Sequence, residues 1–340
     1  MSNQAVYLDA PGSALRLDAA FIPLSGHNDI VMHNHALAIN PIDHTQASSS
    51  GFAIKSYPRV LGQDVAGIIH SIGSNVQGFA IGDRVIAHAW SMRTGENADA
   101  AFQLYARVPA ANAAKLPQTI TFSEGVVLPL ALDTAAAGLY QTLRLPWPRL
   151  SASNGGEEEE EEREGGVLIV YGGSSSVGIA ATQLATASGV RVVAIASEKN
   201  HGLAKEVGAE QVFDQKDADL VEKVVGAVGK DKLVGIFDAI AVDATYKHDL
   251  EILEKFGGGD LIITHPPPKD LPESVKATFI LGLGEFSFPL WKDFIPQALE
   301  SGQLKARPEP LVVGKGLESV QKALEVYAAG VSGKKVVVEL

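Results

Sequence analysis

The chain has 340 residues, of which 46% are hydrophobic, and a formal net charge of −12 at pH 7. This length is sufficient for two domains, and the acidic balance argues against nucleic-acid binding, which needs a basic face. The sequence contains no cysteine, which excludes disulfides, thiolate zinc sites and cysteine nucleophiles. The N-terminus lacks the features of a secretion signal, and no apolar run approaches the roughly 20 residues that span a bilayer. We therefore expect a cytoplasmic protein that makes no contact with a membrane.

Residues 1 to about 125 are predicted to be mainly β-structure. Residues 29–39 alternate in polarity, and a break at 40–43 ends this strand. One face of the strand is expected to carry Val31, His33, His35, Leu37 and Ile39. The segment that follows has glycines at 62, 67, 73, 78 and 82, which separate short strands as in a compact barrel.

From about Thr121 the pattern becomes helical, and the helical pattern ends at the Leu-Pro-Trp-Pro segment of residues 145–148. A polar, acidic linker follows at 151–165. Seven glutamates and one arginine in residues 157–164 contribute −6 to the net charge of −12. We interpret the linker as a solvated surface loop, and an interaction tail is the alternative.

The stretch from Gly165 to Asn200 is predicted to form a strand, a glycine-rich turn, a helix and a second strand. The strands are Val167–Tyr171 and Val190–Ala196, both rich in the apolar β-branched residues of a buried parallel sheet. The turn comprises Gly172, Gly173, Ser174, Ser175, Ser176, Val177 and Gly178. Its glycines allow close approach of the backbone to a ligand, and the first N–H groups of the helix favour an anion. The geometry suits a dinucleotide pyrophosphate, with a purely structural turn as the alternative.

Strands and helices continue to alternate after Asn200. Helices are expected near 201–207, near 219–228 and ahead of the glycines at 257–259. Further strands are expected at 211–214, 233–240, 260–265 and 278–284, which gives six strands in a doubly wound parallel sheet. Three prolines at 266–268 take the chain out of that sheet. Two last helices, near 290–300 and 316–329, precede a strand at 335–340 that is expected to rejoin the first domain.

Several segments together resemble the medium-chain dehydrogenase/reductases over nearly the full length. They are the glycine turn and the segments 40–43 (NPID), 61–67 (LGQDVAG), 82–85 (GDRV), 133–135 (DTA) and 332–338 (SGKKVVV). The resemblance implies an α/β fold with a GroES-like β-barrel domain (1–124, completed by 288–340). It also implies a Rossmann NADP-binding domain (125–287) and an active site in the cleft between the two domains. Within the family, the chain looks most like the zinc-independent quinone oxidoreductase and enoyl reductase branch.

Residues 172–178 (GGSSSVG) and 196–200 (ASEKN) especially resemble the fungal trans-acting enoyl reductases, which serve polyketide synthases. Those enzymes often carry a lysine where this chain has Thr45. Two segments that hold zinc in other relatives here read 40–43 (NPID) and 62–64 (GQD), so no metal is expected. His33 and His35 are interpreted as part of a packed or solvated strand face, with a shared metal as the alternative.

The expected lack of a metal constrains the reaction. Hydride delivery to an isolated ketone builds charge on one oxygen and needs strong electrophilic help. Conjugate delivery to an enone, an enoyl thioester or a quinone spreads that charge over more atoms. We therefore predict an NADPH-dependent reductase of an activated C=C bond. The alternatives are an NADPH:quinone oxidoreductase and a catalytically idle NADPH-binding partner protein.

The cofactor is predicted from the end of the second strand. Enzymes that use NAD usually place an acid there, and this chain has Ala196. Ser197, Lys199 and Asn200 offer donors for a 2′-phosphate, although Glu198 lies among them. The resemblance further implies cofactor contacts by Asn40, Thr134, Val331 and Ser332.

The resemblance also implies a substrate wall within residues 280–286, with Leu281, Leu283 and Phe286. Asp43 has two open roles, a helix cap or an active-site residue. His44 is the candidate proton donor because an imidazole titrates near neutrality, and water is the alternative. The expected partners are a small or carrier-bound enoyl substrate and a polyketide synthase, and both a monomer and a homodimer remain open.

Overall fold

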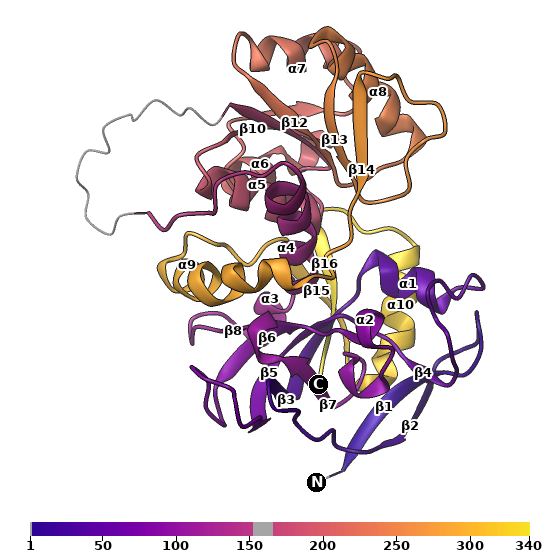
Figure 1. Ribbon diagram of the computed structural model, residues 1–340. Helices are drawn as coiled ribbons and strands as arrows, with labels where there is room; N and C mark the ends of the chain where they lie inside the picture. The colour runs from indigo at the N-terminus through magenta and orange to yellow at the C-terminus, as the bar shows by residue number, and fades with distance from the viewer. Residues whose placement is uncertain (1, 152–165) are drawn as a thin grey trace. The chain divides into compact units, whose positions relative to one another are not determined.

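The computed structural model describes residues 2–151 and 166–340, so the acidic linker beyond residue 151 lies outside the described residues. The chain forms two compact units (Figure 1). Unit 1 comprises residues 1–130, 287–302 and 309–340, and unit 2 comprises residues 131–286 and 303–308. The unit boundaries lie a few residues from the expected ones, and unit 2 also includes a short segment at 303–308.

Unit 1 is built on two β-sheets. A three-stranded sheet has the order β2-β1-β4, and a seven-stranded sheet has the order β15-β16-β3-β5-β6-β8, with β7 paired to β3. The strands of the smaller sheet are β1 (Asn3–Leu8), β2 (Arg16–Ala20) and β4 (Arg59–Val60). Those of the larger sheet are β3 (Asp29–Ala38), β5 (Asp64–Ile72), β6 (Arg84–His88), β7 (Tyr105–Pro109), β8 (Ala113–Lys115), β15 (Glu309–Lys315) and β16 (Lys334–Glu339). The last strand of the chain pairs with β3, so it rejoins the first part of the chain as expected.

Short helices lie between and beside these strands. They are α1 (Pro41–Ala47), α2 (Ser91–Thr94), α3 (Phe122–Gly125), η6 (Leu290–Phe294), α9 (Ile295–Ser301) and α10 (Val320–Ala328). Three single 3₁₀ turns are η1 (Asn97–Asp99), η2 (Ala110–Asn112) and η7 (Leu317–Ser319). Pro41 is the first residue of α1, where its missing N–H removes no helical hydrogen bond.

Unit 2 is a six-stranded sheet in which every pair of neighbours is parallel. The order β11-β10-β9-β12-β13-β14 is the doubly wound order that the sequence predicts. The strands are β9 (Val167–Tyr171), β10 (Arg191–Ala196), β11 (Gln211–Asp214), β12 (Leu233–Asp238), β13 (Gly259–Ile263) and β14 (Val275–Phe279). Strand β9 is fully buried because helices cover both faces of the sheet.

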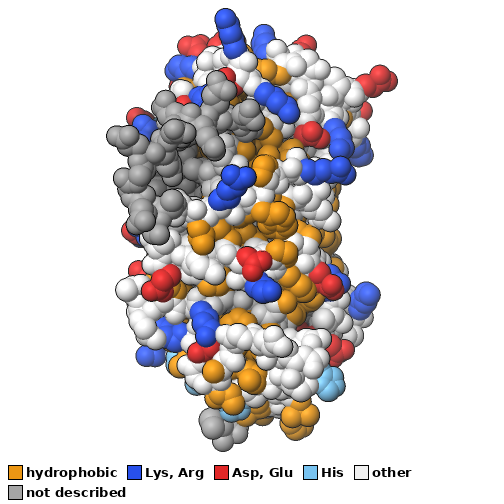
Figure 2. Space-filling view, turned by 60° about the vertical axis from the view of Figure 1, so that its left-hand side comes forward, with side chains coloured by type: hydrophobic (Ala, Val, Ile, Leu, Met, Phe, Trp, Pro, Cys, Tyr) orange, Lys and Arg blue, Asp and Glu red, His pale blue; other side chains and the backbone are white. Residues whose placement is uncertain are grey.

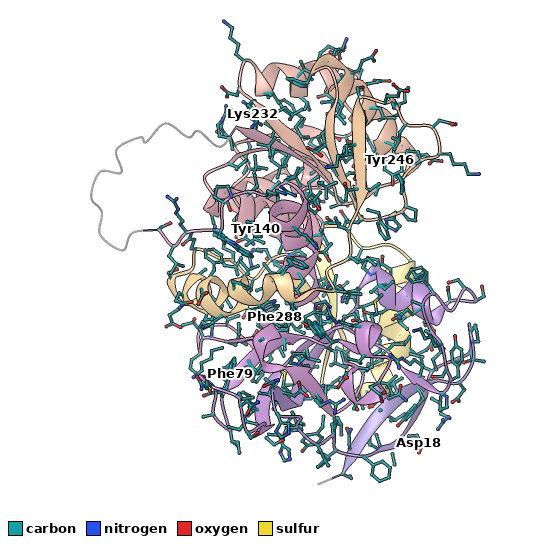
Figure 3. The ribbon with its side chains drawn as sticks, viewed as in Figure 1. Asp18, Phe79, Tyr140, Lys232, Tyr246 and Phe288 are labelled. Atoms are coloured by element: carbon teal, nitrogen blue, oxygen red, sulfur yellow. The ribbon has the colours of Figure 1, made fainter. Side chains whose placement is uncertain are left out.

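The helices of unit 2 divide between the two faces of the sheet, as right-handed crossovers require (Figure 1). One face carries α5 (Ser176–Ala187), α6 (His201–Glu206) and the π-helical segment η3 (Ala137–Thr142), which continues α4 (Pro129–Ala136). The other face carries α7 (Leu220–Val228) and α8 (Asp243–Lys255). Figure 3 marks one tyrosine on each side, Tyr140 in η3 and Tyr246 in α8. Two 3₁₀ turns, η4 (Glu198–Asn200) and η5 (Glu285–Ser287), complete the elements.

Two expectations about elements are wrong in detail. The last strand of the sheet covers 275–279 rather than 278–284, because its β-branched and aromatic residues suit a strand while Gly282 and Gly284 do not. The helical stretch after Thr121 is broken between residues 125 and 129, where Pro129 begins α4. Each shift follows from a glycine or a proline that breaks a regular pattern.

Among the described residues, one helical stretch has the length of a membrane-spanning helix. Phe122–Thr142 is long and apolar enough, by length and composition alone, to cross a bilayer, although it includes Glu124 and Asp133. However, 78% of its most apolar window is buried inside the protein, as in a core helix. On the face shown in Figure 2, acidic and basic side chains are interspersed rather than segregated.

Candidate functional site

The glycine turn in unit 2 has the close-packed geometry of a phosphate-binding turn. Gly172 has a φ of +76°, and a Cβ atom at Gly178 would lie 2.2 Å from the carbonyl oxygen of Gly172. The Oγ atom of Ser175 accepts a hydrogen bond from the Gly178 N–H at 3.1 Å and caps α5. The remaining N–H groups of the first helical turn have no partner within the helix, which suits an anion at this end.

The loop that follows β10 lies beside this turn. The Asn200 side chain donates a hydrogen bond to Ser174 Oγ at 3.1 Å, which joins the two loops. Ser197 Oγ accepts a hydrogen bond of 3.4 Å from Gln215, and Lys199 is exposed. The structure thus joins Asn200 to the turn, while Ser197 and Lys199 lie in the same loop after β10.

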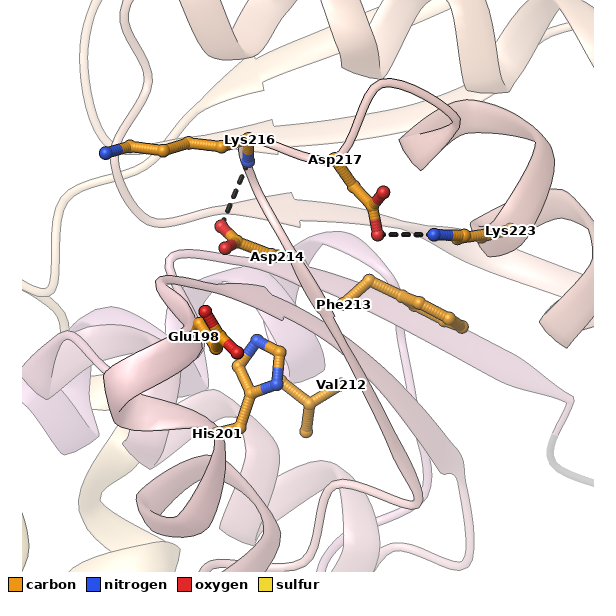
Figure 4. Close-up of a pocket in the computed structure, with 8 residues that line it drawn as sticks. All are labelled: Glu198, His201, Val212, Phe213, Asp214, Lys216, Asp217 and Lys223. Atoms are coloured by element: carbon orange, nitrogen blue, oxygen red, sulfur yellow. Dashed lines mark hydrogen bonds and ion pairs between the residues drawn. The ribbon is translucent and has the colours of Figure 1, made fainter.

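A cavity of about 520 Å³ opens at the carboxyl ends of β10 and β11 (Figure 4). Its lining includes two lysines, of which Lys223 forms an ion pair of 2.6 Å with Asp217. The dashed line at Lys216 in Figure 4 is a hydrogen bond from its backbone N–H to Asp214, and it does not involve the side-chain ammonium. Glu198 also lines the cavity, and the charges there are therefore mixed.

Thr134 lies in α4, next to the segment expected to form a substrate wall. A Cβ atom at Gly282 would be 2.6 Å from the Thr134 backbone nitrogen, so the two backbones are in contact. Leu281 is 47% exposed, Leu283 is half-buried, and the Phe286 ring folds back onto Gly284. Gly282, which lies between Leu281 and Leu283, therefore brings this segment against Thr134 within unit 2.

The other expected site residues lie in unit 1, around a buried polar cluster. Asn40 donates from its side chain to Asp64 at 2.8 Å, and its Oδ1 atom accepts from Lys335 Nζ at 2.5 Å. Lys335 also lies 3.2 Å from Asp64, and the side chains of this pair are only 5% and 0% exposed. Both ends of the Asn40 amide are thus engaged inside the unit. The sequence analysis missed Lys335, for which the only signal is a lysine inside an apolar strand.

Asp43 combines a capping contact with an unusual environment. One carboxyl oxygen accepts the Asn40 backbone N–H at 2.8 Å, which is the capping role that the sequence left open. The other oxygen is buried and has no hydrogen-bond partner among the described residues. Burial raises the pKa of the Asp43 carboxyl to about 7. This group can therefore carry a proton at neutral pH.

His44 and the expected cofactor contacts near the C-terminus complete the residues in unit 1. The His44 ring lies 5.7 Å from the Tyr327 ring and is partly exposed. Val331 and Ser332 lie between α10 and β16, three or four residues before Lys335. Whether His44 donates a proton stays a prediction.

The histidines on β3 belong to a stack of rings. His33 stacks on Tyr105 at 4.8 Å, and His35 stacks on Phe122 at 4.8 Å. Burial lowers the pKa of both histidines, so the fold favours their neutral forms. These contacts are those of a packed strand face.

Two known families match parts of the chain. Residues 26–118 match the alcohol dehydrogenase GroES-like domain, and residues 176–276 match the zinc-binding dehydrogenase family. A dehydrogenase of Emericella nidulans, orsE, is 44% identical over an alignment of 354 residues that covers 100% of this chain and 99% of that protein. This chain belongs to the medium-chain dehydrogenase/reductases. It is therefore an oxidoreductase of this family, and the expected combination of GroES-like and Rossmann domains is confirmed.

One further relative supports the predicted branch of the medium-chain family, and one solved structure shares its fold. A trans-enoyl reductase of Aspergillus japonicus, himH, is 36% identical over 92% of this chain and 90% of its own length. A mycobacterial protein whose structure was solved in complex with NADPH has a TM-score of 0.71 and 24% identity, covering 99% of this chain and 100% of that one. The resemblance to the enoyl reductase branch is confirmed.

Zinc does not fit the residues that this medium-chain protein offers. The sequence has no cysteine, and the described residues contain no group of three or more potential ligand side chains placed to hold a metal. Gln63 lies in the segment that holds zinc in other relatives. Its side chain is fully buried, and neither amide atom has a partner among the described residues. A neutral amide can donate and accept hydrogen bonds, but it is not among the side chains that usually bind zinc.

Proposed function

We propose that this protein is an NADPH-dependent, zinc-independent enoyl reductase that acts in trans with a polyketide synthase, in the cytoplasm. The observation that carries the proposal is the set of potential metal ligands. It has no cysteine and forms no cluster of three or more such side chains among the described residues. With such a set of side chains, the acceptor itself must spread the charge that hydride addition creates. An α,β-unsaturated carbonyl does so as an enolate. The relative himH, which is named a trans-enoyl reductase, supports the same reaction class.

The residues of unit 2 fit a dinucleotide. The turn from Gly172 to Gly178 is too tight for side chains at its last glycine, and the cap on α5 leaves N–H groups for a pyrophosphate. Ser197, Lys199 and Asn200 would hold the 2′-phosphate, and Thr134 would lie near the nicotinamide ribose. When bound, the nicotinamide supplies the hydride.

The protein's own residues would supply orientation and the proton. Leu281, Leu283 and Phe286 would line the acyl chain and exclude water. His44 is the proposed proton donor to the α-carbon of the enolate. Asp43, one residue earlier, holds a proton at neutral pH because burial raises its pKa to about 7. His44 and Asp43 are each replaced by a residue that does not ionise, and the pH profile of kcat is measured. The profile changes in the variant that has lost the proton donor.

The reaction class is tested with a panel of acceptors. Purified protein and NADPH would be supplied with a crotonyl thioester, an enone, a quinone and a simple ketone. We expect the thioester to have the highest kcat/KM. Preferred turnover of the quinone would instead establish a quinone oxidoreductase, and tight NADPH binding without turnover of any acceptor would establish an idle binding protein.

The cofactor preference is tested by Lys199→Ala. The loss of one cation beside the expected 2′-phosphate should raise the KM for NADPH about tenfold, since hydrogen bonds to charged groups are worth about 1.5–3 kcal/mol. The KM for NADH should not change, because NADH lacks that phosphate. Equal effects on the two KM values would contradict the assignment of Lys199.

A further inference from the structure

A second cavity of unit 2 lies between η3 and the last strand of the sheet. Its volume is about 480 Å³, within the range of small-molecule sites. Gln141 and Arg144 contribute from the helical side, and Lys276, Thr278 and Leu281 contribute from β14 and the segment after it. We call this cavity the edge groove. None of its lining residues belongs to the glycine turn.

The sheet register explains how the edge groove forms. Ile262 of β13 pairs with Thr278 of β14, so both side chains point to the same face of the sheet. A Cβ atom at Gly138 of η3 would lie 2.8 Å from the Ile262 side chain, which places η3 on that face. Strand β14 is the last strand in the order, and its outer edge pairs with no described strand. The groove therefore has a helix on one side and free backbone N–H and C=O groups on the other.

One end of the edge groove is cationic. Arg144 is exposed and has no hydrogen bond or ion pair among the described residues, and Lys276 lies 3.7 Å from Asp260 in an exposed and therefore weak pair. No acidic residue lines the groove. In a chain with 40 acidic and 28 basic residues, a groove whose charged lining residues are all cations favours an anionic ligand.

The other end of the edge groove is apolar and leads to the site. Leu281 is 47% exposed, which is unusual for a large apolar side chain. The next residue, Gly282, contacts the backbone of Thr134, which is expected near the nicotinamide ribose. From Lys276 to Leu281 an extended strand spans about 17 Å, at roughly 3.3 Å per residue.

We propose that the edge groove binds the 4′-phosphopantetheine arm of a thioester substrate. The phosphate lies against Arg144 and Lys276, the two amides of the arm pair with the free edge of β14, and the thioester lies near Leu281. An arm with two amide bonds and short methylene chains has a length comparable with five extended residues. The inference deepens the proposed enoyl reductase function and rests on it. Coenzyme A and an acyl carrier domain present the same arm, so both are sources of the ligand.

The test uses two crotonyl thioesters that differ only by the phosphate, those of 4′-phosphopantetheine and of pantetheine. In the double variant Arg144→Gln/Lys276→Gln, we expect kcat/KM for the phosphorylated thioester to fall about tenfold, because the phosphate loses both exposed cations that attract it. The value for the pantetheine thioester should not change. The control variant Lys230→Gln/Lys247→Gln removes the same charge from exposed positions of unit 2 outside the groove and should leave both values unchanged.

Three outcomes overturn the edge-groove proposal: equal losses for both thioesters, an equal loss in the control variant, or a dimer that buries the β14 edge in sedimentation experiments. Calorimetry with free 4′-phosphopantetheine separates this proposal from the proposed function. Binding that only the groove variant weakens supports the groove even if no thioester is reduced, whereas turnover of thioesters without such binding supports the reductase alone. Crotonyl-coenzyme A and a crotonyl carrier protein are then compared as substrates of the double variant. The one whose kcat/KM falls more identifies which of the two presents the arm to the groove.

Discussion

At the scale of single residues, the stability of unit 1 depends on a few buried polar side chains that pair with one another. Lys335, Asp64 and Asn40 are buried and satisfy one another through contacts of 2.5–3.2 Å. The second oxygen of Asp64 accepts the Leu130 backbone N–H at 2.7 Å. Because a buried charge without a partner is costly, removal of one member affects all the others.

Lys335→Ala should destabilise the protein strongly. It leaves the Asp64 carboxylate buried without its cation, for which a loss of about 3–5 kcal/mol in the free energy of unfolding is expected. Lys334→Ala is the matched control, because Lys334 is exposed and 3.6 Å from Glu309. Its loss should be below about 1 kcal/mol. Chemical denaturation of both variants gives the comparison, and similar losses would contradict a structural role for the buried lysine.

Asp43 should make the stability depend on pH. Its pKa is 3.8 when exposed and is raised to about 7 by burial. The contribution of its protonated form to stability is therefore fully present below about pH 4 and is lost as pH rises to 7. Asp43→Asn has no such titration, so its free energy of unfolding relative to the wild type should increase between pH 4 and pH 8. A constant difference over this range would show that the carboxyl is ionised throughout.

At the scale of elements, the glycine turn fixes the distance between α5 and β9. A side chain at the last glycine would collide with the backbone rather than with a movable side chain. The helix must therefore lie close to the strand for its N-terminus to face the turn.

Gly178→Ala should displace the start of α5. The new Cβ atom would lie 2.2 Å from the Gly172 carbonyl oxygen. We expect a loss of about 1–3 kcal/mol from overpacking, and weaker NADPH binding. Gly226→Ala is the control: Gly226 lies inside α7 with open space around its Cβ position. It should stabilise by about 0.5–1 kcal/mol without changing NADPH affinity, as fluorescence titration would show. Normal NADPH binding by the first variant would contradict the role of this turn.

At the scale of the whole molecule, binding of NADPH to the folded protein should raise its stability. At a concentration of 100 times its Kd, NADPH should add about 2.7 kcal/mol to the free energy of unfolding and so raise Tm. NADH at the same concentration should raise Tm less, and Lys199→Ala should remove the difference. Thermal unfolding with each nucleotide measures this, and identical shifts for NADPH and NADH in the wild-type protein would refute the preference for NADPH.

The sequence by itself determined the parts of this protein that local patterns encode. Apolar β-branched runs, the glycine turn and the alternating helices specify unit 2, because burial on both faces leaves a strong periodic signal. The strand Val275–Phe279 was predicted at 278–284, since the residues that follow it up to 281 are also apolar. The motifs around Asn40 and Gln63 pointed to the zinc-independent branch, because they lack the cysteine and histidine that hold zinc in other relatives.

Only the tertiary structure decided which polar groups meet. Lys335 and Asn40 are 295 residues apart, and their contact exists because β16 pairs with β3. The same folding buries Asp43 and thereby raises its pKa, and it places η3 above β14 to form the edge groove. Burial, charge pairing and cavities depend on segments distant in sequence, so no local pattern of residues encodes them.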